Sequence, residues 1–143
     1  MTAAINAGQL EAELAHFTGT SEWHRYLLGI LLTDGARYLA DRAGAWWLLD
    51  AVISYQTGRR VRAVPFQIWR LRVDLAKQTA VLEMGEDVRA QGGMIHYRTP
   101  EDRDAYRETP GAAVTQRIEY TDFPLPEITL YLENGVLYLP SER

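Results

Sequence analysis

The stretch that decides the fold class reads Phe66-Gln67-Ile68-Trp69-Arg70-Leu71-Arg72-Val73-Asp74-Leu75. Large apolar residues at positions 69, 71, 73 and 75 alternate with a second set that includes Arg70, Arg72 and Asp74. This alternation is typical of a β-strand with one face in the core and the other face half exposed. Residues 75–78 then turn the chain into a second strand over residues 79–84, so we predict a β-hairpin over residues 64–84.

A second hairpin is predicted towards the end of the sequence. Ile128, Leu130 and Leu132 alternate with polar or aromatic residues, and Asn134-Gly135 leads directly into a last apolar run over residues 136–139. Asn-Gly between two alternating runs strongly favours a two-residue hairpin turn. Together with a strand expected over residues 113–120, these runs predict an antiparallel sheet of about five strands.

The first part of the sequence has helical patterns instead. We predict helices over residues 4–15, 34–42 and 45–56, and a short helical turn within residues 17–26. Asp34 is placed to cap the second helix and Gly44 to end it. Residues 45–56 are apolar on nearly every side, which is typical of a buried helix. The expected fold class is therefore α+β, with the N-terminal helices packed on one face of the antiparallel sheet in two layers.

The length of 143 residues, with 47% hydrophobic residues, fits one domain with its own core. We divide this domain, residues 1–143, into a helical half (1–58), a first hairpin (64–84), a polar excursion (85–112) and C-terminal strands (113–143). Within the excursion, Thr99-Pro100 resembles a helix start and predicts a short exposed helix near residues 100–108.

Composition excludes several classes of protein. The sequence contains no cysteine, which rules out disulfides, a thiolate nucleophile and a zinc site built on sulfur. No run approaches the about 20 apolar residues that a membrane span needs, and the N-terminus lacks the pattern of a signal peptide. We therefore expect a cytoplasmic protein that does not bind a membrane, and its oligomeric state stays open.

Four blocks of the sequence follow one another in a distinctive order: Phe17-Thr18-Gly19-Thr20, Thr33-Asp34-Gly35-Ala36-Arg37-Tyr38-Leu39-Ala40, Gly44-Ala45-Trp46-Trp47-Leu48-Leu49-Asp50 and Thr121-Asp122-Phe123-Pro124-Leu125-Pro126-Glu127-Ile128. Together they resemble DUF6876, an uncharacterised bacterial family, over most of residues 16–141. The resemblance implies gene content typical of phages, plasmids and other mobile elements. Because the family carries no assigned activity, the resemblance transfers no catalytic residue. Residues 86–112 look longer than the family's usual connection.

The candidates for catalysis are few. His24, Asp34 and Asp122 are the residues that a small hydrolase would use as acid, base or nucleophile. For Asp34 and Asp122 the turn context favours capping of backbone N–H groups. Asp50 lies on the helix that looks buried, so it needs a partner such as Arg37 or Arg70. The three histidines lack the spacing of metal ligands, and no phosphate-binding glycine motif occurs, so we expect neither a metal nor a cofactor.

Charge is distributed unevenly along the chain. The net charge is −4 and the pI is about 5.4, but residues 58–77 hold six basic residues and one acid. A partner could contact this band, whose candidate residues are Arg59, Arg60, Arg62, Trp69, Arg70 and Arg72. Nucleic acid is one such partner, with Trp69 and Phe66 nearby for stacking, although the acidic total is unusual for that function. Alternatively, Arg70 and Arg72 pair with acids on a neighbouring strand, such as Glu83 or Glu133.

Three functions follow as hypotheses. The leading one is a non-catalytic interaction protein of a mobile genetic element, which modulates a host or defence protein that the sequence does not identify. The second is a small hydrolase that uses Asp34, His24 or Asp122, and the third is nucleic-acid binding through residues 59–72. A pocket in which histidine and carboxylates converge would favour the enzyme, whereas an exposed aromatic or charged patch would favour an interaction protein.

Overall fold

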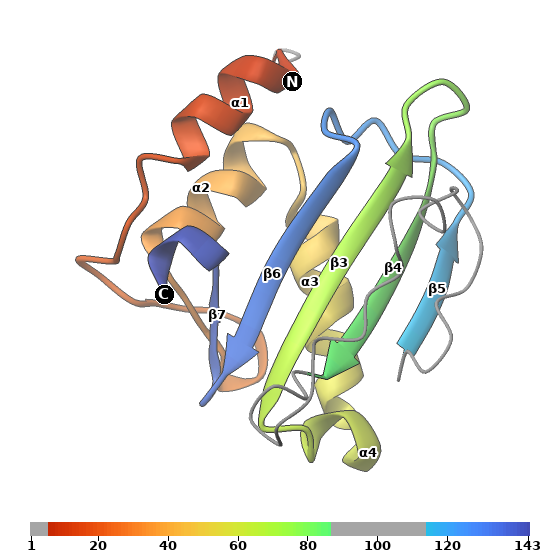
Figure 1. The fold of residues 1–143 in the computed structure, drawn as a ribbon. Coiled ribbons are helices and arrows are strands. Elements are labelled where there is room, and N and C mark those ends of the chain that lie inside the picture. The colour runs from red at the N-terminus through yellow and green to blue at the C-terminus, as the bar shows by residue number, and fades with distance from the viewer. Residues whose placement is uncertain (1–5, 87–113) are drawn as a thin grey trace.

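A computed structural model describes residues 6–86 and 114–143 of the chain (Figure 1). The elements in chain order are α1 (Ala7–Leu14), β1 (His24–Arg25), η1 (Leu27–Gly29), β2 (Leu31–Leu32), α2 (Asp34–Arg42), α3 (Trp46–Ser54), η2 (Tyr55–Thr57), α4 (Arg59–Arg62), β3 (Phe66–Asp74), β4 (Thr79–Glu86), β5 (Val114–Ile118), β6 (Glu127–Glu133), β7 (Val136–Tyr138) and η4 (Pro140–Glu142). Helices and one sheet thus build an α+β fold.

The sheet has seven strands in the order β1-β2-β7-β6-β3-β4-β5. Neighbouring strands are antiparallel except β2 and β7, which run parallel, so the sheet is mixed. Both predicted hairpins are present, and the tighter one turns at Asn134 and Gly135, whose φ angles of 53° and 75° suit a type I′ turn. The expectation of about five strands was too low, because the two-residue strands β1 and β2 extend the sheet beyond β7.

The core lies between α3 and the central strands, as Figure 1 shows with α3 behind β3 and β4. Trp69 and Leu71 on β3 belong to the same buried cluster as Leu48, Leu49 and Val52 on α3. This arrangement explains why residues 45–56 are apolar on so many sides. Further members of the cluster come from α1, α2, β4, β6 and β7. No helix of the described residues is long and apolar enough to cross a membrane.

The helix predictions hold in part. The second helix has the predicted bounds, whereas the first spans Ala7–Leu14 and the third ends at Ser54 before continuing as the 3₁₀ turn η2. The helical turn expected within residues 17–26 is wrong, because residues 24–25 pair with β2 instead. The helix α4, which has only four residues and follows Gly58 directly, was not predicted. The helix expected near residues 100–108 lies outside the described residues.

One expectation about β3 needs correction. Arg70 and Arg72 are not half exposed: they are 1% and 4% exposed. Both guanidinium groups contact Glu83 on β4, at 2.9 Å from Arg70 Nη2 to Oε1 and 2.8 Å from Arg72 Nε to the same oxygen. Glu127 lies 3.7 Å from Arg70 as well. The expected pairing with Glu83 is therefore confirmed, whereas the other suggested acid, Glu133, accepts a hydrogen bond from Tyr138.

Replacing Glu83 by glutamine should destabilise the fold strongly. The change removes the carboxylate that contacts both buried guanidinium groups, and breaking a buried ion pair costs about 3–5 kcal/mol. Urea unfolding of the wild type and E83Q measures this cost. E119Q is the matched control because Glu119 is exposed, so its effect should stay within about 0.5 kcal/mol. An E83Q effect as small as that of the control would contradict a structural role for Glu83.

Candidate functional site

Two of the candidate catalytic residues, His24 and Asp34, contact each other in the structure. His24 Nε2 lies 2.8 Å from Asp34 Oδ1, and Arg37 Nη1 lies 3.1 Å from His24 Nδ1. A guanidinium group can only donate, so Nδ1 must accept and Nε2 must carry the proton that His24 donates to Asp34. The other oxygen of Asp34 accepts from the backbone N–H of Ser21 at 2.9 Å. Both nitrogens of His24 and both oxygens of Asp34 therefore have partners.

This cluster fastens the segment before β1 to the first turn of α2. The backbone N–H of Asp34 donates to Thr20 Oγ1 at 2.9 Å, and that hydroxyl donates to the carbonyl of Glu22 at 2.6 Å. The hydrogen bond from His24, followed by that from Ser21, lowers the pKa of Asp34 below its ordinary value. Asp34 was expected to cap its own helix, but Thr33 is the N-cap residue, and the side chain of Asp34 binds the preceding loop instead.

The other acidic candidates lie elsewhere. Asp50 is exposed and accepts a hydrogen bond from the Tyr26 hydroxyl, so the expectation of a buried acid paired with Arg37 or Arg70 is wrong. That hydrogen bond raises the pKa of Tyr26 to about 12. Asp122 is also exposed and lines a surface hollow different from that of Asp34. Among residues 6–86 and 114–143, no group of three or more histidines and acids is placed to hold a metal ion.

The arginine band is divided by the fold. Arg70 and Arg72 are buried with Glu83, and Trp69 is buried on the opposite face of β3. The indole N–H of Trp69 donates to Gln67 Oε1 at 2.9 Å, so this ring is not available for stacking on a partner. In contrast, the three arginines of α4 are exposed and form no ion pair within the described parts of the chain; they are Arg59, Arg60 and Arg62.

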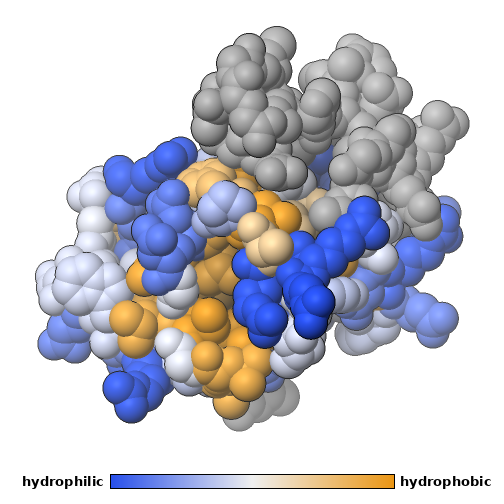
Figure 2. Space-filling model, turned by 90° about the horizontal axis from the view of Figure 1, so that it is seen from below, coloured by the Kyte–Doolittle hydropathy of each residue, from blue (hydrophilic) through white to orange (hydrophobic). Residues whose placement is uncertain are grey.

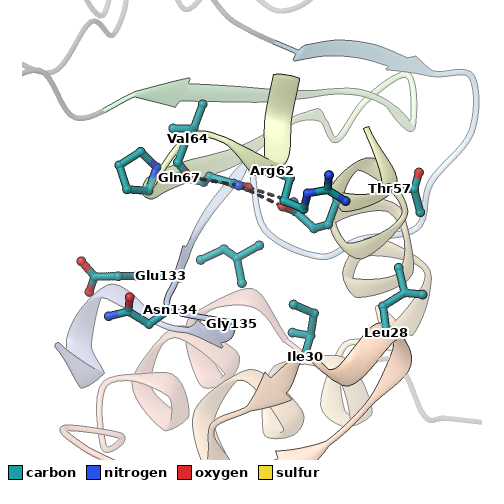
Figure 3. Close-up of a pocket in the computed structure, with 12 residues that line it drawn as sticks. Leu28, Ile30, Thr57, Arg62, Val64, Gln67, Glu133, Asn134 and Gly135 are labelled. Carbon is teal, nitrogen blue, oxygen red and sulfur yellow. Dashed lines mark hydrogen bonds between the residues drawn. The ribbon is translucent and has the colours of Figure 1, made fainter. Parts of the chain in front are cut away.

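A groove lies beside these arginines, between η1 and Ile30 on one side and the η2–α4–β3 connection on the other (Figure 3). It encloses about 520 Å³, and we call it the α4 groove. Figure 3 shows Leu28 and Ile30 across the cavity from Arg62 and Val64, with the turn between β6 and β7 along one end. The lining residues are Leu28, Ile30, Gln56, Thr57, Arg62, Val64, Pro65, Gln67, Leu132, Glu133, Asn134 and Gly135.

Two side-chain amides form part of the floor of the α4 groove. Gln56 and Gln67 donate to each other's carbonyl oxygens, both at 2.9 Å. The amide of Gln67 also donates to the carbonyl of Val61 at 2.9 Å, and that of Gln56 to the carbonyl of Val52 at 3.0 Å. Because these amides satisfy each other and the nearby backbone, they make a fixed floor rather than a polar subsite.

Exposed hydrophobic side chains occur within residues 23–28, and one of them, Leu28, lines the α4 groove. Trp23, Leu27 and Leu28 are 57%, 50% and 65% exposed. Leu28 has a φ of 54° and a ψ of 27°, the left-handed region that a bulky residue rarely adopts. This exposure was not predicted from the sequence, in which residues 27–32 are largely apolar. Gly29, which also has a positive φ, was the available sign of an unusual turn.

A comparison with known families identifies the chain. The family described as a "Family of unknown function (DUF6876)" matches residues 8–143. The chain belongs to this family. The match covers nearly the whole chain and confirms the resemblance seen in the four sequence blocks. No curated protein and no solved structure matches the chain, so membership of DUF6876 brings no activity with it.

The DUF6876-like residues of the second block hold the end of the chain in place. The Thr33 hydroxyl donates to Glu142 Oε1 at 2.6 Å, and the Gly35 N–H donates to Oε2 at 3.0 Å. The Leu139 N–H donates to Oε1 as well, at 2.9 Å. A methyl group at Gly35 would lie 2.6 Å from the Glu142 carboxyl and 2.7 Å from Leu139, so the close approach requires glycine. This block therefore has a structural role that explains its residue types.

The remaining DUF6876-like positions also serve the fold. The Trp46 indole N–H donates to Asp41 Oδ1 at 2.9 Å, and Trp47 packs partly buried against the core. Phe123 is buried, and its N–H donates to Thr121 Oγ1 at 3.1 Å. Pro124 is half-buried and Pro126 is exposed in the segment that leads into β6. These residues lie in several separate places and do not form one site.

Replacing Gly35 by alanine should destabilise the protein. The new methyl group overlaps Leu139 and the bonded carboxylate of Glu142, and overpacking of this kind costs about 1–3 kcal/mol. The cost is measured by urea unfolding. G19A serves as control, because a methyl group at Gly19 meets nothing within 4 Å. Equal stabilities of G35A and G19A would show that the end of the chain does not pack against α2 in this way.

Because of Asp34, the stability of the fold should change with pH in the acidic range. Its pKa is lowered in the folded state, so the ionised carboxylate stabilises the fold at neutral pH, and that contribution is lost as pH falls through the folded-state value. Urea unfolding between pH 7 and about pH 2 should therefore show D34N less stable than the wild type at neutral pH, with the gap closing below about pH 4. D122N is the control, since Asp122 is exposed, and a gap for D34N that is independent of pH would contradict the assignment.

Proposed function

We propose that this DUF6876 chain is a non-catalytic domain that binds another protein. The observation that carries the proposal is the exposure of three large apolar side chains within residues 23–28, where Trp23, Leu27 and Leu28 are at least half exposed. Leaving such side chains in water costs free energy, and Leu27 and Leu28 are neighbours on the exposed turn η1, an arrangement that is typical of an interaction surface. Figure 2, which views the molecule from below Figure 1, shows hydrophobic side chains gathered near its centre, with hydrophilic ones beside them.

The geometry gives a hydrolase less support. A general base needs a free lone pair within reach of a substrate, but both nitrogens of His24 are engaged by Asp34 and Arg37. Asp122 lies in a different hollow from Asp34. Nucleic-acid binding also has less support, because Trp69, Arg70 and Arg72 are buried and leave one turn of exposed arginines.

The kind of partner follows from the family resemblance. Gene content typical of phages and plasmids leads us to propose that the chain is an accessory protein of a mobile genetic element, and that its partner is a host or defence protein. Because the sequence contains no cysteine, we place this interaction in the cytoplasm.

An affinity pull-down tests this function. The tagged protein is incubated with lysate of its native host, with and without nuclease, and captured proteins are identified by mass spectrometry. We expect one stoichiometric protein partner that survives nuclease. The triple variant W23S/L27S/L28S should lose this partner, because the serines remove the exposed apolar area.

A matched double variant controls for the loss of any exposed apolar side chain. Leu75 and Tyr120 are 49% and 67% exposed but lie outside residues 23–28, so L75S/Y120S should keep the partner. Absence of any stoichiometric partner, or a capture that nuclease abolishes, would contradict the proposed function.

A further inference from the structure

We propose that the α4 groove binds an acidic peptide segment of the partner protein, with one large apolar side chain of that segment in the cavity and its carboxylates on the arginines of α4. The inference rests on the proposed interaction function and names the chemistry of the partner. Arg59, Arg60 and Arg62 would hold the carboxylates. Leu28, Ile30 and Val64 would contact the apolar side chain.

The cavity has the size and the lining of a binding site. Its volume of about 520 Å³ lies within the range of about 300–1,000 Å³ found for ligand pockets. Leu28, Ile30, Val64 and Leu132 supply apolar walls. The amides of Gln56 and Gln67 are satisfied by each other, so an apolar group can cover them without leaving an unpaired polar atom.

The positive charge of the α4 arginines favours an anionic peptide segment. Arg62 lines the cavity itself, and Arg59 and Arg60 lie on the same short helix. No ion pair joins these three arginines to any other residue in the ranges 6–86 and 114–143. Among the described residues, the one acid that lines the groove is Glu133, which already accepts a hydrogen bond from Tyr138. Guanidinium groups bind carboxylates through paired, charge-assisted hydrogen bonds, so an acidic segment complements this surface.

The surface around the arginines favours a peptide over other anions. Single-stranded nucleic acid needs aromatic rings on which its bases stack, and the described residues that line the α4 groove include no aromatic side chain. A small acidic molecule would fill the cavity and contact Leu28 but leave the exposed side chain of Leu27 uncovered. A peptide segment reaches beyond the cavity, so it can cover Leu27 as well.

The backbone conformation of Leu28 makes it possible to test whether its side chain serves packing or binding. A leucine at a φ of 54° is strained, and strain of this kind persists where a function requires the side chain. Glycine adopts the same backbone freely, so L28G removes the side chain and relieves the strain at once. If Leu28 serves packing, L28G lowers the urea midpoint. If it serves binding, the midpoint stays unchanged or rises while binding weakens.

The experiment uses random 12-residue peptides displayed on phage, selected on the full-length chain. Enriched peptides are synthesised with a fluorescent label, and their affinities are measured by fluorescence polarisation. We expect enriched peptides to hold at least two acidic residues beside a large apolar one. L28G and R62E should each weaken their binding about tenfold or more, and added salt should weaken it further.

The turn between β3 and β4 supplies matched controls. L75S removes an exposed leucine and K77E reverses an exposed basic residue there, and neither change should alter peptide affinity. Four results would overturn the proposal: no enriched peptide, enriched peptides without acidic residues, unchanged affinity in L28G and R62E, or self-association that the same two variants abolish. In the last case a second copy of the chain occupies the groove.

The same variants separate this inference from the proposed function. If the lysate yields a stoichiometric partner that L28G and R62E still bind with unchanged affinity, the interaction function stands and the assignment of the α4 groove falls. If both variants lose the lysate partner while L75S and K77E retain it, the groove is the interaction site. If the lysate yields no partner at all, the proposed function itself falls.

Discussion

The reciprocal hydrogen bonds between the amides of Gln56 and Gln67 hold α4 against the sheet, and the candidate site depends on them. A helix of four residues has too few internal hydrogen bonds to be stable by itself. Gln67 lies on β3 and donates to the carbonyl of Val61 within α4, while Gln56 joins the end of α3 to the same amide. Three elements therefore meet at one buried polar contact. Its position sets the floor of the α4 groove and the direction of the arginines beside it.

The central strand β3 separates two kinds of interior. On one face, Trp69 and Leu71 pack against α3 in the hydrophobic core. On the other face, Arg70 and Arg72 share the carboxylate of Glu83. Buried charges of this kind stabilise a fold only when each is paired, so β3 and β4 have to keep one register. This constraint removes two arginines from the surface, so the exposed arginines of the band are those of α4.

The edge of the sheet shows how the exposure of Leu27 and Leu28 arises. The strands β1 and β2 are two residues each, and the turn η1 between them carries Leu27 and Leu28 outward. The cluster of His24, Asp34 and Arg37 fixes β1 to the start of α2, and this contact anchors the strand that precedes the turn. The carboxylate of Glu142 fixes the same end of α2 to the last residues of the chain. Polar contacts thus position a surface whose exposed groups are apolar.

The sequence by itself determined the elements whose signals are local. Alternation predicted β3 and β6, Asn134-Gly135 predicted the last hairpin, and the run from Asp34 to Gly44 predicted α2 with its bounds. Short-range patterns suffice there because the hydrogen bonds of a helix or a tight turn join residues that are close in the chain. The two-residue strands β1 and β2 carry no such period, so they were not predictable. Family membership was also visible in the sequence alone.

Only the tertiary structure decided which of these residues form a surface. Arg62 and Arg70 look alike in the sequence, yet one is exposed at the α4 groove and the other is 1% exposed beside Glu83. Leu28 looks like a core residue, but the turn η1 places it outside. The physical reason is that burial depends on which elements pack together, and residues far apart in the chain make that decision, as the hydrogen bond from Thr33 to Glu142 illustrates.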